Sequence, residues 1–363
     1  MTPQELKVLQ ALRHNPMASQ QEIANQLGLS RESVAGHIMR LTRKGKIIGK
    51  GYIFPPPKSI VVIGGANVDL IGSSFHSFLP ADSNPGSISQ TAGGVARNIA
   101  ENLARLGTQV QLVSVIGNDP RGRWLLDDLV RCQISTEHCM VKPGLSTGTY
   151  IALNDSSGFL QGAVADMSIM DKFGPDDLIS RLPTLQAANQ ILVEANCSEE
   201  LIQWLAEQQF SSPISADAVS ETKAPRLAAL LPKLSILKTN RAEALAILQQ
   251  SSLSNDEILD ALLEKGIKKV LLSLGAEGAI LANSEQRIQA APPKTDQMIS
   301  DTGAGDALMA AVMYSELQEH TLQQQLQLAL ACATFTLKST LAVNPDLSYE
   351  KIQLWMENSC TNI

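Results

Sequence analysis

The sequence has few cysteines, and none of its apolar runs is long enough to cross a membrane. Its five cysteines are odd in number and include no Cys-x-x-Cys pair, which favours reduced thiols in a cytoplasm over a disulfide framework or a zinc site. The longest apolar runs, such as residues 60–63, are far shorter than the roughly 20 residues that span a bilayer. The start of the chain lacks the segments of a signal peptide. We therefore expect a cytoplasmic protein without a membrane segment.

Common catalytic signatures are absent as well. No Walker A sequence occurs, and Gly64-Gly65-Ala66-Asn67-Val68-Asp69 does not have the Gly-x-Gly-x-x-Gly spacing, which disfavours a dinucleotide-binding fold. There is no serine nucleophile elbow, and the five histidines are scattered rather than clustered. These absences argue against a serine hydrolase and against a histidine-based metal centre.

The net charge of −7 divides unevenly along the 363 residues. Residues 1–58 contain nine Lys or Arg and three acidic residues, whereas the remainder contains 20 basic and 33 acidic residues. The overall composition, with 44% hydrophobic and 18% charged residues, is that of a globular protein long enough for two domains. The asymmetry suggests a basic module with an anionic partner, attached to an acidic, enzyme-like body.

The basic module has the pattern of three short helices followed by a hairpin. Helices are predicted over 4–13, 20–27 and 30–44, and two short strands over 46–54. This pattern resembles a winged helix-turn-helix, in which 30–44 is the recognition helix and double-stranded DNA is the partner. The candidate DNA-binding residues are Arg31, Ser33, His37, Arg40 and Lys44. The alternative is a small helical domain with a solvated charged face, used for dimerisation or gating. We place this domain at 1–54 and a stiff proline linker at 55–58.

The remainder alternates short β-branched runs with amphipathic helices. This alternation predicts a doubly wound α/β fold with a mostly parallel sheet and ligands at the carboxyl ends of the strands. The predicted strands lie at 60–63, 110–116, 191–193, 214–216, 236–238 and 269–274. A hairpin over 147–164, together with 87–91, breaks the alternation; it is either a surface hairpin or a small separate sheet that acts as a lid.

The strongest chemical signal is Asp301-Thr302-Gly303-Ala304-Gly305-Asp306-Ala307, which leads into a helix at 307–317. Glycines before a helix leave backbone N–H groups open, and the helix dipole adds to the attraction for an anion such as a transferring phosphoryl group. A carboxylate in that first turn can take the proton of an attacking hydroxyl. The alternative is a glycine turn capped by an aspartate.

A second pattern, Gly93-Gly94-Val95-Ala96-Arg97-Asn98, also places glycines before a helix. Glycines allow the backbone to approach a polyol closely, and an asparagine can both donate to and accept from sugar hydroxyls. Asp69, shortly after the first strand, is suited to vicinal hydroxyls. Taken separately, each of these residues is more often a turn glycine or a helix cap than a ligand-binding residue.

In this order, the motifs resemble the PfkB family of ribokinase-like carbohydrate and nucleoside kinases over 59–363, and within it the pseudouridine kinases. The segments around Asp82, Asp166 and Asn344 carry the second likeness. The resemblance implies a lid from about 69–92 and 147–166, a homodimer through that lid, and ATP- and Mg²⁺-dependent phosphorylation of a nucleoside 5′-hydroxyl. The alternatives are a kinase for another nucleoside or a sugar, or a transcriptional regulator that uses the kinase fold as a ligand sensor.

The resemblance also implies roles for individual residues. Asp306 is the expected catalytic base, with the anion hole at Gly303, Ala304 and Gly305. The expected substrate-binding residues are Asn67, Asp69, Asp82, Gly93, Gly94, Asn98 and Asp166. The expected ATP-binding residues are Asn240, Glu243, Ser273, Gly275, Gly278 and Thr302, with Asn240 and Glu243 reaching Mg²⁺ through water. Ser300 stands where many members have an aspartate tied to a monovalent-cation loop, so dependence on K⁺ stays open.

Overall fold

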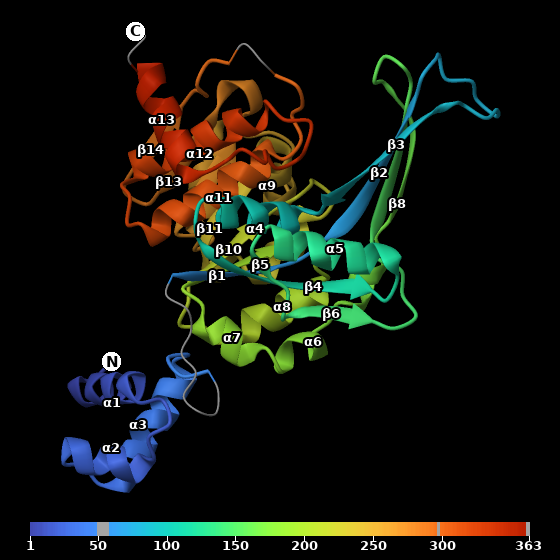
Figure 1. Cartoon of the computed structure of the whole chain (residues 1–363). Coiled ribbons are helices and arrows are strands. Elements are labelled where there is room, and N and C mark those ends of the chain that lie inside the picture. The colour runs from blue at the N-terminus through green and yellow to red at the C-terminus, as the bar shows by residue number, and fades with distance from the viewer. Residues whose placement is uncertain (49–57, 296–297, 361–363) are drawn as a thin grey trace.

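The computed structural model describes residues 1–48, 58–295 and 298–360, and its first unit is a bundle of three helices. These are α1 (Pro3–His14), α2 (Gln20–Leu27) and α3 (Arg31–Arg43), as Figure 1 shows. Each begins at a hydroxyl side chain that accepts a backbone N–H of the first turn, which explains why the helices start where they do. The bundle has a hydrophobic core of its own. The three predicted helices are confirmed, whereas most of the predicted wing and linker, 49–57, lies outside the described residues.

The second unit is built on a large twisted sheet. Its strand order is β14-β13-β12-β11-β10-β9-β1-β4-β5, and β6 pairs with β4. The strands are β1 (Ser59–Ile63), β4 (Gln109–Gly117), β5 (Ile134–Ser135), β6 (Cys139–Lys142), β9 (Gln190–Glu194), β10 (Ile214–Asp217), β11 (Leu234–Asn240), β12 (Lys269–Ser273), β13 (Ala279–Asn283) and β14 (Arg287–Ala290). The pairings from β5 to β12 are parallel, as predicted, but β13 and β14 add an antiparallel edge that we did not predict.

Helices cover both faces of this sheet. Along β1, Ile60 and Val62 belong to one core and Val61 and Ile63 to the other, because successive side chains of a strand point to opposite faces. The first core packs against α4 (Val95–Arg105), α5 (Pro120–Arg131), α11 (Ala304–Leu317), α12 (Leu322–Thr336) and α13 (Tyr349–Cys360). The second packs against α6 (Asp176–Ile179), α7 (Leu182–Ala187), α8 (Glu199–Glu207), α9 (Arg241–Leu248) and α10 (Asn255–Glu264). The predicted doubly wound architecture is therefore confirmed.

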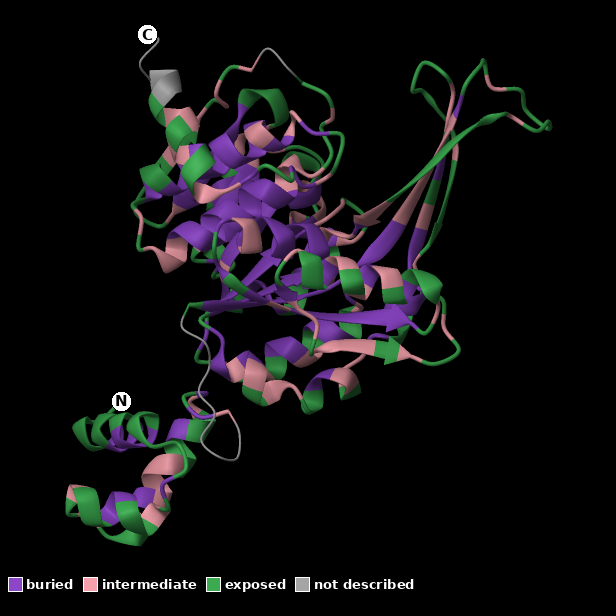
Figure 2. Ribbon diagram, viewed as in Figure 1, coloured by how far each residue is buried: buried purple, intermediate pink, exposed green. Residues whose placement is uncertain are grey.

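A second, smaller sheet projects from the body, as Figure 1 shows. Its order is β3-β2-β7-β8, from β2 (Asn67–Ser74), β3 (Gly86–Gly93), β7 (Thr149–Asn154) and β8 (Leu160–Asp166). The small separate sheet is thus confirmed, although β2, which contains glycine and polar residues, was not recognised as a strand. The outer half of the sheet is mostly exposed, as Figure 2 shows.

In the described part of the chain, no helix has both the length and the apolar character needed to cross a bilayer.

Candidate active site

A cavity of about 640 Å³ lies where the small sheet meets the carboxyl ends of the central strands. The small sheet contributes Asn67, Asp69 and Tyr150 to its lining. The starts of two helices face it, through Asn98 of α4 and Asp306 of α11. Elements distant in sequence therefore meet at the edge of the sheet where a doubly wound fold is expected to bind ligands.

Asp306 lies in the first turn of α11 and is 8% exposed. The Nδ2 group of Asn98 donates a 2.8 Å hydrogen bond to its Oδ2 atom. Burial, with the nearby Asp217 carboxylate, raises the pKa of Asp306 to about 7, while Lys238 and Asn98 act in the opposite direction. A carboxyl group with a pKa near neutrality can take up a proton and release it again at physiological pH.

The N-terminus of α11 is open to an anion. Gly303 is the N-cap residue, and no side chain caps the helix. Its φ of +83° lies in the left-handed region, and an added Cβ atom would lie 1.8 Å from the carbonyl oxygen of Ala342, so only glycine fits. The first N–H groups of α11, at Ala304 and Gly305, are thereby left for a ligand, as the sequence motif predicts.

A buried cluster of charged residues lies beneath this helix end. Asp217, at the end of β10, forms an ion pair with Lys238 of β11 at 3.2 Å. A Cβ atom on Gly305 would lie 3.1 Å from Lys238 Nζ, which places the ammonium group beside the anion hole. Burial alone would lower the pKa of Lys238, but Asp217, Glu243 and Asp306 raise it above its ordinary value. The ammonium group therefore remains charged next to the position predicted for a phosphoryl group.

Glu194 ends β9 in the same cluster. Its carboxylate accepts hydrogen bonds from the backbone N–H of Gly65 at 2.7 Å and from that of Asn196 at 2.8 Å. Burial raises the pKa of Glu194 to about 7, even though these hydrogen bonds favour the ionised form. The residue links the ends of β9 and β1 at the floor of the cavity.

The predicted sugar-binding residues come together on the small sheet. Asn67 Nδ2 donates to Asp69 Oδ1 at 2.6 Å, and burial raises the pKa of Asp69. Gly93 is opposite Asn67 in the paired strands, and a Cβ atom there would lie 2.3 Å from Asp69 Oδ2. Glycine is therefore required for Asp69 to occupy this position. Gly94, also in the cavity wall, precedes α4.

Asn240 and Glu243 form a capping box at the start of α9. Asn240 Nδ2 and backbone N–H donate to the two carboxylate oxygens of Glu243 at 2.7 and 2.9 Å. Burial raises the pKa of Glu243. No group of three His, Cys, Asp or Glu side chains within the described residues could hold a metal ion. The oxygen donors present fit a Mg²⁺ ion that keeps its waters and is held largely by phosphate oxygens, rather than a chelated metal.

The remaining predicted ATP-binding residues lie on the neighbouring strand and loops. Ser273 is opposite Asn240 in the parallel pairing of β12 with β11, and Gly275 and Gly278 are in the loop that follows. These residues do not line the cavity, whereas Thr302 does.

Two predicted substrate residues lie away from this cavity. Asp82 is in the exposed loop between β2 and β3, where its carboxylate accepts the N–H of Ser83. Asp166, at the end of β8, is exposed and accepts hydrogen bonds from the backbone N–H and hydroxyl groups of Ser168. The neighbours of Asp166 in sequence do line the cavity, so this end of β8 is at its rim.

In the N-terminal unit, the candidate DNA-binding residues divide into two groups. Arg31 and Ser33 are in the first turn of α3, with Arg31 exposed. Arg40 and Lys44 instead form ion pairs with the buried Glu5 of α1, at 3.2 and 2.8 Å. Hydrogen bonding from Lys44 and the N–H of Thr2 lowers the pKa of Glu5 to about 2. The Nδ1 atom of His37 accepts a hydrogen bond from the guanidinium group of Arg40 at 2.8 Å.

Sequence reasoning missed several charged residues of the site. Glu194 directly follows the predicted strand 191–193 and Lys238 ends the predicted strand 236–238, and neither residue was given a role in the site. Lys223 and Arg226 line the cavity from the segment after β10, where Arg226 lies in a 3-10 helix, Ala224–Ala229. A charged residue at the carboxyl end of a predicted buried strand was the available signal for the first two, because such a residue needs a partner or a function.

Comparison with known proteins finds relatives for both units. The pfkB family carbohydrate kinase model matches residues 57–348, and a winged helix-turn-helix DNA-binding model matches residues 1–48. An uncharacterized sugar kinase of Escherichia coli K12 is 34% identical over 354 residues, which cover 96% of this chain and 97% of the relative. The pseudouridine kinase of the same organism is also 34% identical, over 309 residues that cover 84% of this chain and 98% of that enzyme.

The fold also matches solved structures. Arabidopsis thaliana ribokinase, complexed with ribose and ATP, superposes with a TM-score of 0.72 at 20% identity, covering 83% of this chain and 99% of that one. The expected ribokinase-like fold is therefore confirmed.

Proposed function

The chain belongs to the pfkB family of carbohydrate kinases, and we propose that it transfers the γ-phosphoryl group of ATP to the 5′-hydroxyl of a nucleoside, with pseudouridine as the preferred substrate. Membership of the family makes the protein a phosphotransferase with an alcohol acceptor. The separate match over residues 1–48 gives it an N-terminal winged helix-turn-helix domain. The predicted resemblance is thereby confirmed, and what we propose beyond it is the substrate and the roles of individual residues.

The observation that carries the proposal is the position of Asp306, buried at an open helix N-terminus and facing the cavity. In the proposed reaction, the substrate oxygen attacks the γ-phosphorus while its proton passes to Asp306, and the bond from the γ-phosphorus to the bridging oxygen breaks to release ADP. The N–H groups at 303–305 and the ammonium group of Lys238 stabilise the charge on the transferring oxygens. Mg²⁺, when bound with ATP, supplies further charge neutralisation, and Asn240 and Glu243 would hold its water ligands.

A nucleoside fits the composition of the cavity. The polar residues Asn67, Asp69 and Asn98 offer donors and acceptors for ribose hydroxyls on one side. Tyr150, Met167 and other apolar residues form the neighbouring wall, against which a flat base can pack. The relative that bears the name pseudouridine kinase supports the choice of nucleoside.

The substrate proposal is tested by measuring ADP release with a panel that contains pseudouridine, uridine, inosine, ribose and fructose phosphates. We expect the highest kcat/KM with pseudouridine and no turnover with 5′-deoxypseudouridine, which lacks the accepting hydroxyl. A higher kcat/KM for a sugar than for every nucleoside would contradict the proposal and favour the alternative of a sugar kinase.

We also propose that the N-terminal domain binds double-stranded DNA through the start of α3. The support is the helix-turn-helix match over 1–48, the basic balance of this segment and the exposed position of Arg31. Because Lys and Arg release counterions from DNA, affinity should fall steeply with salt. In fluorescence anisotropy with genomic fragments, Arg31→Ala should weaken binding and reduce the salt slope, while the surface control Lys265→Ala should not. Equal affinity of the two variants would contradict the proposal.

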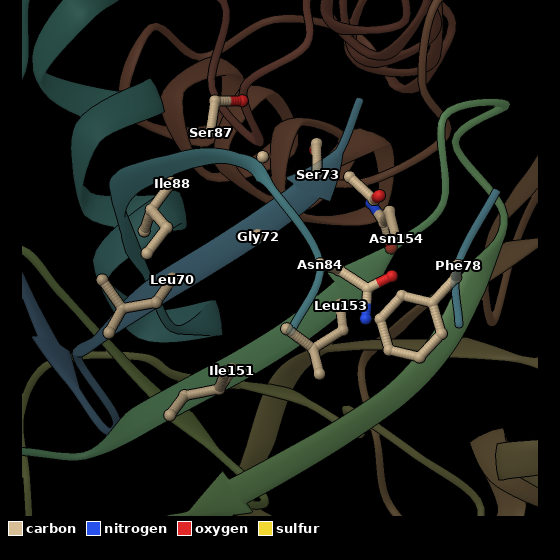
Figure 3. A pocket seen from close by; sticks show the side chains of 12 residues that line it. Leu70, Gly72, Ser73, Phe78, Asn84, Ser87, Ile88, Ile151, Leu153 and Asn154 are labelled. Atoms are coloured by element: carbon tan, nitrogen blue, oxygen red, sulfur yellow. The ribbon is translucent and has the colours of Figure 1, made fainter. Parts of the chain in front are cut away.

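A homodimer through the small sheet is the third part of the proposal. The face of this sheet opposite the active site carries Leu70, Ile151 and Leu153, and Ile88 is 80% exposed there. Figure 3 shows these side chains around one hollow, of about 350 Å³. Exposed apolar area of this kind favours burial against a second copy. Ile88→Glu should therefore give a monomer in sedimentation velocity where the unaltered chain gives a dimer; a monomeric unaltered chain would contradict this part.

A further inference from the structure

Arg97 is buried directly beside Asn98, the residue that contacts Asp306, and its contacts extend away from the cavity. Its guanidinium is paired with Glu101 at 2.5 Å and with Asp128 of α5 at 3.1 Å. One nitrogen of the same group donates to Asn98 Oδ1 at 3.2 Å. A continuous chain of hydrogen bonds therefore runs from Asp128 through Arg97 and Asn98 to Asp306.

The chemistry of the donors determines which way the Asn98 amide points. A guanidinium group has only donors, so the atom of Asn98 that faces Arg97 must be the carbonyl oxygen. The amide nitrogen then faces Asp306, and because an NH₂ group only donates, Asp306 must accept with Oδ2. Among the described residues, Oδ2 is the oxygen of Asp306 that receives a hydrogen bond, which leaves Oδ1 for the substrate hydroxyl.

We propose that Arg97 is a positioning residue that holds the amide of Asn98 in this orientation and so keeps Asp306 able to accept a proton from the substrate. The proposal rests on one part of the proposed function, namely that Asp306 is the catalytic base. Arg97 does not line the cavity that contains Asp306, so it acts through Asn98 rather than on the substrate itself.

The opposite orientation of the amide has a definite consequence. Without Arg97, Asn98 could turn its oxygen toward Asp306 Oδ2, and two acceptors would then face one another. Protonation of Asp306 would relieve this contact, because the acid form can donate. The carboxyl group would then be held in the form that cannot act as a base.

Other charged groups also face Asp306 and must be held constant in any test. Asp217 on β10 and Glu194 on β9 favour its neutral form, whereas Lys238 on β11 favours its ionised form. None of the three forms a hydrogen bond or an ion pair with Arg97 within the described residues. Substitution of Arg97 therefore leaves these groups in place.

The test measures the titration of the Asp306 carboxyl group by ¹³C NMR in the full chain labelled at aspartate, with the signal assigned from Asp306→Asn. Relative to the unaltered chain, Arg97→Met should raise the pKa of Asp306 by about one to two pH units, which is the effect of a charge-assisted hydrogen bond. Arg97→Lys, which keeps a donor-only cation, should restore most of the original value.

Two controls separate orientation from charge and from stability. Arg105→Met removes a second arginine that pairs with Glu101, at 2.7 Å, but does not contact Asn98, and should leave the titration unchanged. In an Asn98→Ala background, Arg97→Met should cause no further shift, because the two residues act in one chain. If Arg97→Met does not fold, Arg97→Met/Asp128→Asn, which removes a charge of each sign, carries the same prediction.

An unchanged titration in the Arg97 variants, or an equal shift with Arg105→Met, would overturn the proposal. The dependence of kcat on pH at saturating nucleoside supplies the second measurement: Arg97→Met should lose more activity at pH 6 than at pH 9. Saturation is needed because the charge of Arg97 also lowers the pKa of Asp69, so its loss can change the Kd for nucleoside. A shifted NMR titration without any change in this profile would leave the positioning role standing and would instead refute Asp306 as the base.

Discussion

Replacement of Asp306 by asparagine should stabilise the protein against unfolding while it removes activity. Burial raises the pKa of Asp306 from 3.8 to about 7, which means that its ionised form is held in an unfavourable environment. The unfolded chain binds fewer protons than the folded one between these two values, so stability falls as the pH rises from about 4 to about 7. By this linkage, ionisation of Asp306 destabilises the folded state by about 4 kcal/mol at pH 8 and by less than about 2 kcal/mol at pH 5. Asparagine keeps the shape of the side chain and carries no charge, so it should recover much of this free energy.

The assay is urea unfolding followed by tryptophan fluorescence at pH 5, 6, 7 and 8. All three tryptophans, Trp124, Trp204 and Trp355, lie outside the N-terminal domain, so the signal reports on the kinase domain alone. Asp306→Asn should be the more stable protein at pH 8, with a difference that shrinks steadily toward pH 5. Glu194, which also has a raised pKa, is present in both proteins, and its repulsion of Asp306 is already contained in the raised pKa of Asp306. A variant no more stable at pH 8, or a difference independent of pH, would refute the reasoning.

Three further predictions follow from the site. In the unaltered enzyme, kcat/KM should rise with pH and level off above an apparent pKa of about 7, because only ionised Asp306 accepts a proton. Stopped assays measure this profile, and a kcat/KM that stays constant down to pH 5 would contradict the prediction. In Gly303→Ala, the new Cβ atom would lie 1.8 Å from the Ala342 carbonyl oxygen, so the backbone must shift and an oxyanion contact is lost. The kcat value, measured in a steady-state assay at saturating substrate, should fall by about 10²–10³-fold. Gly93→Ala should displace Asp69 and raise KM for the nucleoside while KM for ATP is unchanged, and parallel changes in both constants would argue against a sugar-binding role for Asp69.

Local signals in the sequence were sufficient for most of the fold. The α2 helix begins and ends where its capping box and Gly28 place it, and β1 is the buried run expected from its four β-branched residues. These elements depend on neighbours in sequence, so periodicity and caps locate them. The β2 strand was missed because Asp69 and Gly72 interrupt its alternation of apolar and polar residues. Asp69 has a low propensity for strands, and its place in β2 is explained by its position in the cavity wall.

The site was predictable only as far as its motifs extend. The positions of Asp306 and Gly303 follow from a short glycine-rich turn before a helix. The contact of Asn98 with Asp306 joins residues 208 positions apart, and no local pattern contains it. The same holds for the ammonium group of Lys238 beside the anion hole, which depends on how β11 lies under α11. Such contacts are fixed by tertiary packing rather than by the sequence around either residue.

The central claim, that Asp306 accepts the proton of the substrate hydroxyl as the phosphoryl group is transferred, is tested most directly by single-turnover rates. Asp306→Asn and the unaltered chain are each mixed with ATP, Mg²⁺ and pseudouridine, and nucleoside 5′-monophosphate is measured over time. We expect the rate constant of the variant to be lower by about 10²–10⁴-fold, while the Kd for pseudouridine changes by no more than a few-fold. A rate within tenfold of the unaltered enzyme would contradict the account.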